Sequence, residues 1–258
     1  MTSALPRRPL GSTGIEVSAL GLGTVKLGRD QGLKYPAPFT IPDDAAAARL
    51  LDTAADVGIN LLDTAPAYGR AEARLGQLLK GQRDRWVIVS KTGEQFAAGR
   101  SRFDFSPEAT REGVEASLRA LDTDWLDCVL VHSDGNDLDI IRRLGTLDAL
   151  RDLQRAGAIR SYGMSTKTLA GGLAAVAACD VVMVTLNRDA VEELPVILAA
   201  HRRGRGVLVK KPLGSGHLGD TAAQQLQWVL ARPGVSAAVV GTIDPLHLAA
   251  NAAALREA

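Results

Sequence analysis

Short apolar runs alternate with amphipathic stretches along nearly the whole chain. Eight runs rich in Val, Ile and Leu have the length of buried strands, and they lie at 18–24, 60–64, 86–91, 126–132, 159–164, 180–186, 206–211 and 236–240. Stretches with apolar residues at helical spacing follow them, at 43–57, 71–80, 107–121, 146–156, 168–178, 192–203, 221–231 and 245–256. Because each strand is followed by a helix, the pattern predicts a parallel sheet.

Eight such repeats close into a (β/α)8 barrel, so the predicted fold class is α/β with a TIM barrel. A doubly wound open sheet is the alternative, but no predicted strand is followed by a G-x-G-x-x-G motif that opens a helix. The 258 residues suit one barrel, and we expect 1–258 to form a single domain. The long loops 27–42 and 93–106 follow strands, and such loops build the active sites of barrels.

Composition and charge exclude several classes of function. The net charge of +1 gives no electrostatic reason to expect nucleic acid or an anionic membrane as partner. Cys128 and Cys179 lack metal-ligand spacing and lie in or beside apolar runs, so we expect buried, reduced thiols and no metal site. Since the sequence shows no signal-peptide core and no membrane-spanning stretch, we expect a cytoplasmic protein.

Three consecutive predicted strands each place an ionisable residue at the C-terminal end of the strand, with the same parity as the apolar interior positions. These residues are Asp63, Lys91 and His132. Neighbouring strands lie about 4.8 Å apart, so the three side chains can converge within about 10 Å. Tyr68 follows five residues after Asp63 and can fold back over the same place. A buried Asp and Lys are costly unless they pair, and here they can.

This combination suits proton transfer to a carbonyl oxygen. A phenol titrates near 10, and we expect Lys91 to lower the pKa of Tyr68 while Asp63 holds the lysine. An imidazole beside them can orient or polarise a carbonyl, with hydride supplied by a cofactor. Taken singly, the pair could be a salt bridge at the rim, Tyr68 a loop anchor and His132 a core histidine. Their joint placement favours function.

At these residues the sequence resembles the aldo-keto reductase superfamily, from Arg8 to about Asn251. The resemblance rests on the segments LGSTG (10–14), LGLGT (20–24), LDTAPAYG (62–69), SK (90–91), LVH (130–132), GMS (163–165), VKKPLGSG (209–216) and VVG (239–241). It implies a barrel with an N-terminal β-hairpin plug and an enzyme that interconverts a small carbonyl compound (aldehyde or ketone) and an alcohol. It also implies a catalytic tetrad with Tyr68 as general acid in reduction, formed by Asp63, Tyr68, Lys91 and His132.

The resemblance further implies a nicotinamide cofactor bound across the C-terminal face without a Rossmann domain. NADP(H) is the expected cofactor and NAD(H) the alternative. Ser165 would hold the nicotinamide carboxamide, the segment Leu213–Gly216 the pyrophosphate, and Asn251 the adenine. The remaining expected cofactor contacts are Gly23, Thr24, Thr166, Asn187, Lys210, Lys211, Pro212, Gly214, Ser215, Gly241, Thr242 and His247.

The sequence departs from the family pattern around the cofactor. Thr166 replaces a common Asn, Met183 a common Gln, and Lys210 an aromatic residue that often stacks on the nicotinamide. His247 stands where a basic residue near the 2′-phosphate is expected. We therefore predict weaker NADPH binding and less discrimination against NADH than is usual in the family. New phosphate contacts would reverse this prediction if they came from Lys167, Lys210 or Lys211, which are otherwise solvated.

Alternative functions remain open. Phe96, Phe103 and Phe105 are expected to shape the substrate pocket, and the pattern FDFS (103–106) also occurs in relatives that oxidise sugars at the anomeric carbon, so an aldose dehydrogenase is one alternative. A non-catalytic, cofactor-sensing subunit is another. A barrel lyase or isomerase with a Schiff base on Lys91 is disfavoured because Asp63 keeps the lysine protonated. The sequence leaves substrate, reaction direction and oligomeric state open.

Overall fold

A closed barrel of eight parallel strands forms the centre of the computed structural model, which describes residues 5–256. The strands are β3 (Leu20–Gly23), β4 (Leu61–Asp63), β5 (Val87–Thr92), β8 (Cys128–His132), β9 (Tyr162–Ser165), β10 (Val181–Thr185), β11 (Gly206–Lys210) and β12 (Ala237–Val240). They neighbour one another in chain order, and β12 pairs with β3 to close the barrel. The predicted TIM barrel is confirmed.

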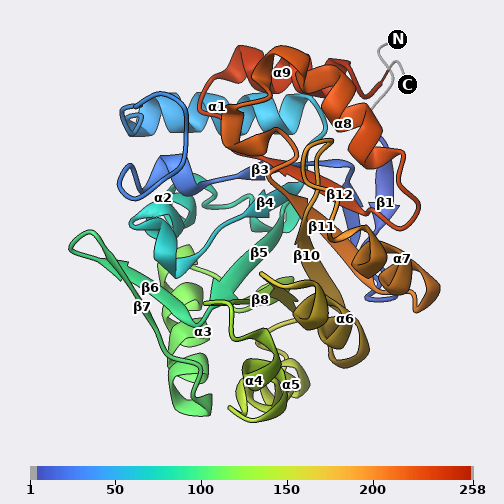
Figure 1. Cartoon of the computed structure of the whole chain (residues 1–258). Helices are drawn as coiled ribbons and strands as arrows, with labels where there is room; N and C mark the ends of the chain where they lie inside the picture. Colours follow the sequence, from blue (N-terminus) through green and yellow to red (C-terminus); the bar gives the residue numbers. More distant parts are fainter. Residues whose placement is uncertain (1–4, 257–258) are drawn as a thin grey trace.

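Helices surround the strands (Figure 1). Their bounds are α1 Asp44–Asp56, α2 Ala71–Leu78, α3 Pro107–Leu121, α4 Asp137–Arg142, α5 Thr146–Arg155, α6 Leu169–Ala178, α7 Leu194–Arg202, α8 Ala222–Leu230 and α9 Pro245–Ala253. Side-chain caps set where several begin: Asp43, Ser106, Thr168 and Asp244 each accept a hydrogen bond from a backbone N–H in the first turn. Within residues 5–256, no helix combines the length and the apolar character needed to cross a membrane.

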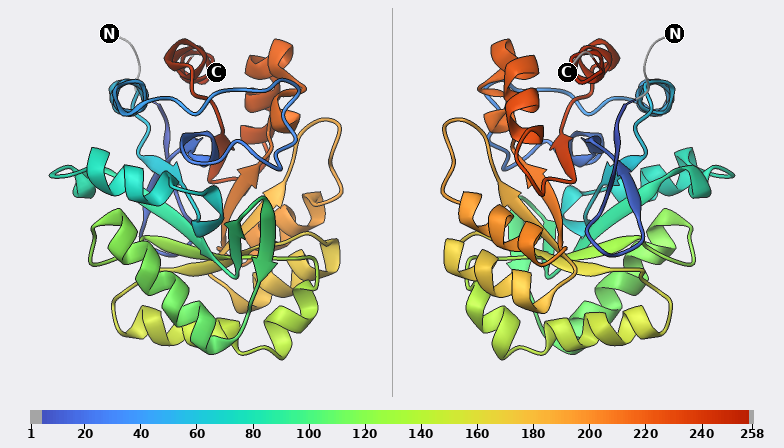
Figure 2. Two further views of the ribbon diagram at one scale, coloured as in Figure 1. Left: turned by 90° about the vertical axis from the view of Figure 1, so that its left-hand side faces the viewer. Right: turned by 90° about the vertical axis from the view of Figure 1, so that its right-hand side faces the viewer.

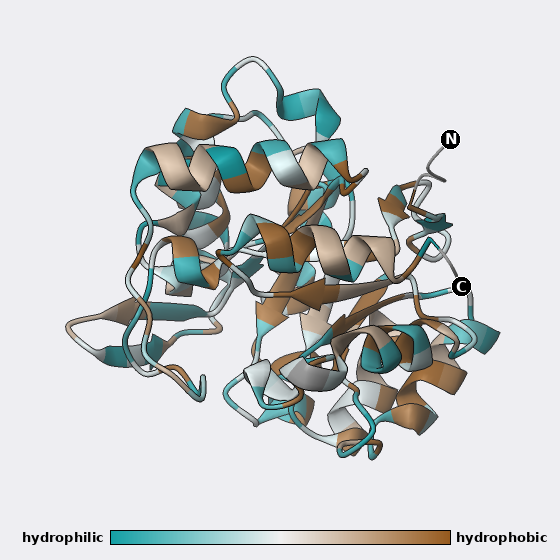
Figure 3. Cartoon of the chain, turned by 90° about the horizontal axis from the view of Figure 1, so that it is seen from above, coloured by the Kyte–Doolittle hydropathy of each residue, from teal (hydrophilic) through white to brown (hydrophobic). Residues whose placement is uncertain are grey.

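Two layers of apolar side chains stabilise the barrel. One layer lies between strands and helices, and the other fills the barrel interior with alternate residues of the strands, among them Leu61, Val89 and Leu130. Figure 3 shows apolar strands at the centre of the molecule. Both cysteines are free and buried, as expected, and burial raises the pKa of each thiol to about 12.

The N-terminal hairpin closes the base of the barrel. Its strands are β1 (Arg7–Pro9) and β2 (Glu16–Ser18), and Leu10 belongs to the interior apolar layer. Gly11 has a φ of +60° and lies so close to β11 that a Cβ would be 2.3 Å from the Gly206 nitrogen. Only glycine fits at this position. The predicted plug is present.

The two long loops differ in structure. The stretch 93–106, predicted as a loop, contains an antiparallel hairpin of β6 (Glu94–Ala97) and β7 (Arg100–Phe103), which Figure 1 shows projecting from one side of the barrel. Ala98 and Gly99 form its turn with positive φ. After the 3-10 turn Val25–Leu27, residues 28–43 carry no helix or strand, and Figure 2 shows this blue loop running toward α8.

Candidate active site

A cavity of about 850 Å³ opens at the C-terminal ends of the barrel strands. Its size lies in the upper part of the range of about 300–1,000 Å³ that ligand sites occupy. The lining includes the last residues of β3, β4, β8, β9, β11 and β12 together with residues of the loop after β3. It also contains every predicted tetrad residue, Asp63, Tyr68, Lys91 and His132. The cavity is therefore the candidate active site.

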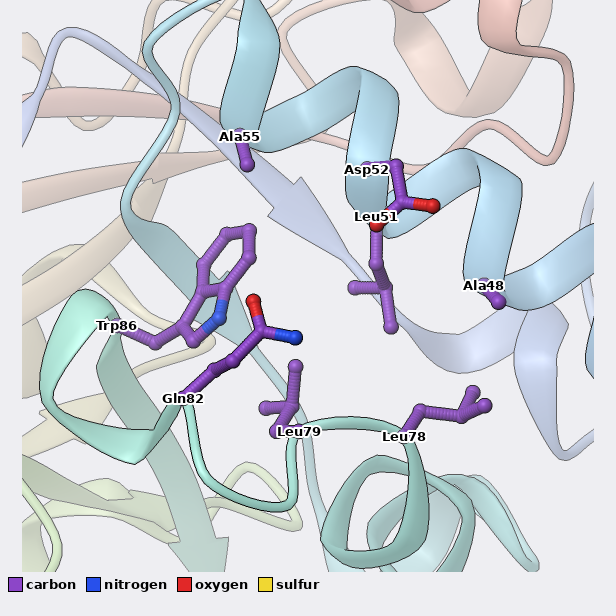
Figure 4. Close-up of a pocket in the computed structure, with 8 residues that line it drawn as sticks. All are labelled: Ala48, Leu51, Asp52, Ala55, Leu78, Leu79, Gln82 and Trp86. Atoms are coloured by element: carbon purple, nitrogen blue, oxygen red, sulfur yellow. The ribbon is translucent and has the colours of Figure 1, made fainter.

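A much smaller hollow lies between α1 and α2. It is lined by Ala48, Leu51, Asp52, Ala55, Leu78, Leu79, Gln82 and Trp86. Figure 4 shows the side chains of the two helices and of the segment after α2 around it. Its volume of about 30 Å³ holds little more than one water molecule, and Asp52 is its only ionisable side chain. This hollow is therefore not a candidate active site.

Three of the tetrad side chains are joined by direct contacts. Lys91 Nζ donates to Asp63 Oδ1 at 2.6 Å and to the Thr64 carbonyl oxygen at 2.8 Å, and the lysine is 2% exposed. The Tyr68 hydroxyl donates to Asp63 Oδ2 at the longer distance of 3.4 Å. The sequence-based expectation that these groups converge is thus met. The ion pair between Asp63 and Lys91 offsets the free-energy cost of burying the two charges.

Local structure fixes these positions. Asp63 ends β4, and its carbonyl oxygen accepts hydrogen bonds from both the backbone N–H and the hydroxyl of Thr24. Tyr68 ends the 3-10 turn Pro66–Tyr68 and precedes Gly69, which has a φ of +62°. A Cβ on Gly69 would lie 2.2 Å from the Gly28 carbonyl oxygen. The close packing of these two glycines therefore holds Tyr68 over the strand ends.

The pKa of Tyr68 is raised, which corrects the expectation that Lys91 lowers it. Burial is the largest cause, and the negative charge of Asp63 adds to it, so the phenol pKa lies well above its ordinary value. The lysine ammonium faces Asp63 and Thr64 instead of the phenol oxygen, and its Nζ lies 4.7 Å from the centre of the Tyr68 ring. Tyr68 is therefore a neutral hydrogen-bond donor in this structure.

His132 completes the floor of the cavity. Its ring meets that of Tyr68 edge to face, with 6.4 Å between ring centres. Its Nδ1 lies 2.7 Å from Oε2 of Glu94, the first residue of β6. Burial lowers the pKa of His132, and Glu94 opposes this shift. Glu94 was missed from sequence because it falls in a stretch that was predicted as a loop.

Most residues expected at the cofactor line the same cavity. They are Gly23, Ser165, Lys210, Lys211, Pro212, Leu213, Ser215, Gly216, Gly241, Thr242, His247 and Asn251. Four others lie outside the lining. Thr24 donates hydrogen bonds to the Asp63 carbonyl oxygen, as described above. The Thr166 hydroxyl donates to Glu193, and the Asn187 side chain donates to the Lys211 carbonyl oxygen. Gly214, with a φ of +57°, lies in the turn beside Ser215.

Lys210 is half-buried in the cavity wall, where protein groups hold its ammonium. Its Nζ donates to the Ser165 hydroxyl at 2.9 Å and to the Thr166 carbonyl oxygen at 2.7 Å. Burial lowers the pKa of Lys210 to about 8. Lys167 lies elsewhere, with Nζ 5.6 Å from the centre of the Phe103 ring. Of the three lysines considered for phosphate contacts, Lys210 and Lys211 line the cavity.

The charge of the cavity lining suits an anionic ligand. Two acidic side chains in its lining, Asp63 and Glu94, are both paired, whereas the basic ones number six: Lys26, Arg29, Lys34, Lys91, Lys210 and Lys211. At one side of the cavity, Gly241 packs so closely against Tyr35 that a Cβ there would lie 2.8 Å from the Tyr35 hydroxyl. The charge of the lining suits a dinucleotide with its phosphates.

The loop after β3 supplies residues that sequence reasoning did not find. Lys26 lies 3.9 Å above the Tyr35 ring and 4.8 Å from the Phe39 ring, and all three line the cavity. Arg29 lies 3.4 Å from the centre of the Phe96 ring. No periodic pattern marks this loop, so only its basic and aromatic composition hinted at a role.

The aromatic residues expected to shape the pocket do not line it. Phe105 is buried in the core, Phe103 is 39% exposed and stacks on it, and Phe96 supports Arg29 from outside the lining. The FDFS segment has a structural role at the start of α3. Asp104 accepts from the Ser106 N–H, and Ser106 caps the helix.

Comparison with known proteins shows which proteins this chain is similar to. The model of the aldo/keto reductase family matches residues 19–225. The oxidoreductase YqkF of Bacillus subtilis, which is uncharacterized, is 31% identical over 164 residues, or 62% of this chain and 48% of YqkF. L-galactose dehydrogenase of Arabidopsis thaliana is 34% identical over 164 residues, or 61% of this chain and 47% of that protein. The chain spans about half the length of these curated relatives.

Solved structures match nearly the whole chain. PA4992 of Pseudomonas aeruginosa, provisionally described as an aldo-keto reductase, is 52% identical with a TM-score of 0.91, covering 99% of this chain and 96% of that one. The aldo-keto reductase AKR11C1 of Bacillus halodurans, in its holo form, is 26% identical with a TM-score of 0.81, covering 97% and 90%. Because the family model covers most of the sequence and the barrel agrees with it, the chain belongs to the aldo/keto reductase family.

Proposed function

We propose that this chain is an NAD(P)(H)-dependent oxidoreductase that interconverts a carbonyl compound and an alcohol. The observation that carries the proposal is the convergence of Asp63, Tyr68, Lys91 and His132 on the floor of a cavity lined with basic residues. A neutral phenol, an ion pair and an imidazole at one place provide for proton transfer to a substrate oxygen.

The bound cofactor would supply the hydride, and the side chains would manage the proton. As the carbonyl oxygen gains negative charge, Tyr68 gives it the phenolic proton. Burial keeps this proton on Tyr68 until the substrate oxygen becomes the stronger base. Lys91, anchored by Asp63, lies close enough to stabilise the phenolate that forms. In the reverse direction the phenolate accepts the proton of the alcohol.

The proposed cofactor is NADP(H), with NAD(H) as the alternative. Ser165 would hold the carboxamide, the turn Leu213–Gly216 the pyrophosphate, and Asn251 the adenine. Ser165, Asn251 and the turn apart from Gly214 line the cavity. Support comes from the basic side chains that line the cavity. Lys210 binds the Ser165 hydroxyl and is thereby directed at the carboxamide end.

We expect the purified protein to oxidise NADPH or NADH in the presence of a reactive aromatic aldehyde. The measurement is the loss of absorbance at the nicotinamide band across a panel of aldehydes, ketones and sugars. Binding of both cofactors without turnover of any carbonyl would contradict the proposal and favour the cofactor-sensing subunit. A Schiff base on Lys91 is disfavoured because its ammonium is held by Asp63 and Thr64.

A sugar dehydrogenase is a second candidate. It is favoured by the match to L-galactose dehydrogenase, whereas the FDFS segment no longer supports it because that segment caps α3. The same site would act in the direction of oxidation, with the substrate hydroxyl giving its proton to Tyr68. Assays of aldoses with NADP+ and NAD+, run beside the aldehyde panel, separate the two candidates.

Replacing His247 by Arg should tighten NADPH binding selectively. The His247 side chain is 76% exposed at the cavity edge, with Nδ1 3.6 Å from Asp244 Oδ2. An imidazole offers one nitrogen to a phosphate, whereas a guanidinium binds in a bidentate manner. One charged hydrogen bond contributes about 1.5–3 kcal/mol, which corresponds to roughly 10- to 100-fold in affinity. Equilibrium titration of the variant with NADPH and NADH measures the effect.

Leu246→Arg is the matched control, because Leu246 is exposed beside His247 and lies outside the cavity lining. It adds the same charge without the same contact, so its NADPH affinity should change little. If the wild-type protein already binds NADPH about a thousandfold tighter than NADH, a difference of about 4 kcal/mol, the premise of a weak 2′-phosphate site is wrong.

A further inference from the structure

The contact between Glu94 and His132 has no part in the mechanism above. Glu94 comes from the projecting hairpin, not from the barrel, and its Oε2 lies 2.7 Å from Nδ1 of His132. The other carboxylate oxygen accepts a hydrogen bond from Ser101 of β7 at 2.5 Å. The hairpin thus holds a carboxylate against one edge of the imidazole that faces the candidate active site.

The carboxylate is ionised throughout the neutral range. Burial would raise its pKa, but His132, the Ser101 hydroxyl and the charge of Arg29 together lower the pKa of Glu94 to about 2. An ionised carboxylate only accepts hydrogen bonds. The nitrogen of His132 that faces it must therefore carry a hydrogen for the contact to be favourable.

The two nitrogens of His132 have different surroundings. Nδ1 is fully buried. Glu94 lies within hydrogen-bond distance of it, but the angle at the hydrogen departs from that of an ideal hydrogen bond. The side chain as a whole keeps 23% of its surface exposed and lines the cavity, so the Nε2 edge is the one presented to a ligand. Catalytic hydrogen bonds commonly straighten only when substrate binds.

We propose that Glu94 is a positioning residue that keeps the hydrogen of neutral His132 on Nδ1. Nε2 of the neutral ring then accepts a hydrogen bond from a substrate alcohol. Nε2 donates to a substrate carbonyl only after the ring is protonated. The inference rests on the proposed function for its consequence in catalysis. The pairing of Glu94 with His132 makes the rates of reduction and of oxidation depend on pH through one side chain.

Charges on several elements act on the same ring. Lys91 of β5 and Lys210 of β11 are positive and disfavour its protonation, as burial does, whereas Glu94 favours it. Tyr68 is neutral, and Asp63 is engaged by Lys91. The pKa of His132 is lowered overall. Removing the charge of Glu94 must lower it further, because Glu94 is the carboxylate in contact with the ring.

Nitrogen NMR of the histidine rings tests the proposal without turnover. The neutral wild-type ring should carry its hydrogen on Nδ1. In Glu94→Gln the amide can donate to Nδ1, so the hydrogen should move to Nε2 and the apparent pKa should fall by about one unit or more. His132→Gln assigns the signals against those of His201, His217 and His247. Gln95→Ala, the exposed neighbour on β6, is the matched control and should change neither quantity.

The pH profile of kcat/KM gives a second readout. For carbonyl reduction by the wild-type protein it should fall about tenfold per pH unit above the pKa of His132, since the neutral ring presents a lone pair to the carbonyl. In the Glu94→Gln variant this decrease in kcat/KM should be absent, because the neutral His132 ring can donate from Nε2. A purely structural role for Glu94 would lower the rate without changing the shape of the profile.

The outcomes are separable from those of the proposed function. An unchanged tautomer and pKa of His132 in Glu94→Gln, or a wild-type ring with its hydrogen on Nε2, would overturn the inference even in an active enzyme. Loss of turnover with every carbonyl would refute the proposed function, while the NMR result would still decide whether Glu94 sets the state of His132.

Discussion

Tyr68→Phe is expected to lower kcat for carbonyl reduction by about 10²- to 10⁴-fold, the usual contribution of a positioned general acid. The change removes one hydroxyl whose hydrogen bond to Asp63 is long, at 3.4 Å, so the fold should lose little stability. Cofactor affinity should stay within about threefold of wild type, because proton transfer is needed in the transition state and not for binding. Single-turnover kinetics and equilibrium cofactor titration measure the two quantities.

Tyr162→Phe is the matched control for this variant. The Tyr162 hydroxyl also makes one long hydrogen bond, at 3.4 Å to the Ala178 carbonyl oxygen, but Tyr162 does not line the cavity. It should retain nearly full activity. If Tyr68→Phe kept most of the wild-type turnover, Tyr68 would not be the acid, and the proton would have to come from another group of the cavity floor.

Lys91→Met should abolish turnover and also destabilise the protein. The lysine is almost completely buried, and its removal leaves the Asp63 carboxylate buried with only the long contact to Tyr68. Breaking a buried ion pair from one side costs about 3–5 kcal/mol, because the remaining charge has no partner. We therefore expect a loss of this size in the free energy of unfolding by urea, together with a fall in kcat of at least about 10²-fold.

The double variant Asp63→Asn/Lys91→Met separates stability from chemistry. It leaves no unpaired charge, so much of the lost free energy of unfolding should return, whereas activity should not. Arg111 offers a control of the opposite kind, since its contact with Asp152 at 3.4 Å is exposed and should contribute at most about 1 kcal/mol. A Lys91→Met protein as stable as wild type would contradict the view that Asp63 depends on this lysine.

The cavity that contains Tyr68 and Lys91 also holds basic side chains that the proposed proton transfer does not use. Lys210 donates a hydrogen bond to Ser165, and Lys26 is held above two aromatic rings of the loop after β3. These groups suit an anionic cofactor, and both lysines line the cavity. The charges of Lys91 and Lys210 lower the pKa of His132, and Glu94 opposes this shift.

The sequence by itself determined the barrel and the position of the tetrad. Hydrophobic periodicity is local information, and the predicted strands agree with the observed ones to within about three residues at each end. Parity along a strand also decides which side chains point inward, so the sequence alone could place Asp63, Lys91 and His132 together. Asp43 and Ser106, which cap the starts of α1 and α3 in the structure, also act within their own segments.

Only the tertiary structure decided what surrounds these residues. The pKa of Tyr68 depends on burial and on the charge of Asp63 at a specific distance, and sequence reasoning had its direction wrong. Glu94 reaches His132 through a hairpin that carries no long periodic pattern, and the two are separated by 38 residues in the chain. Desolvation and charge contacts arise from segments that meet only after folding, so no pattern within one segment could have specified them.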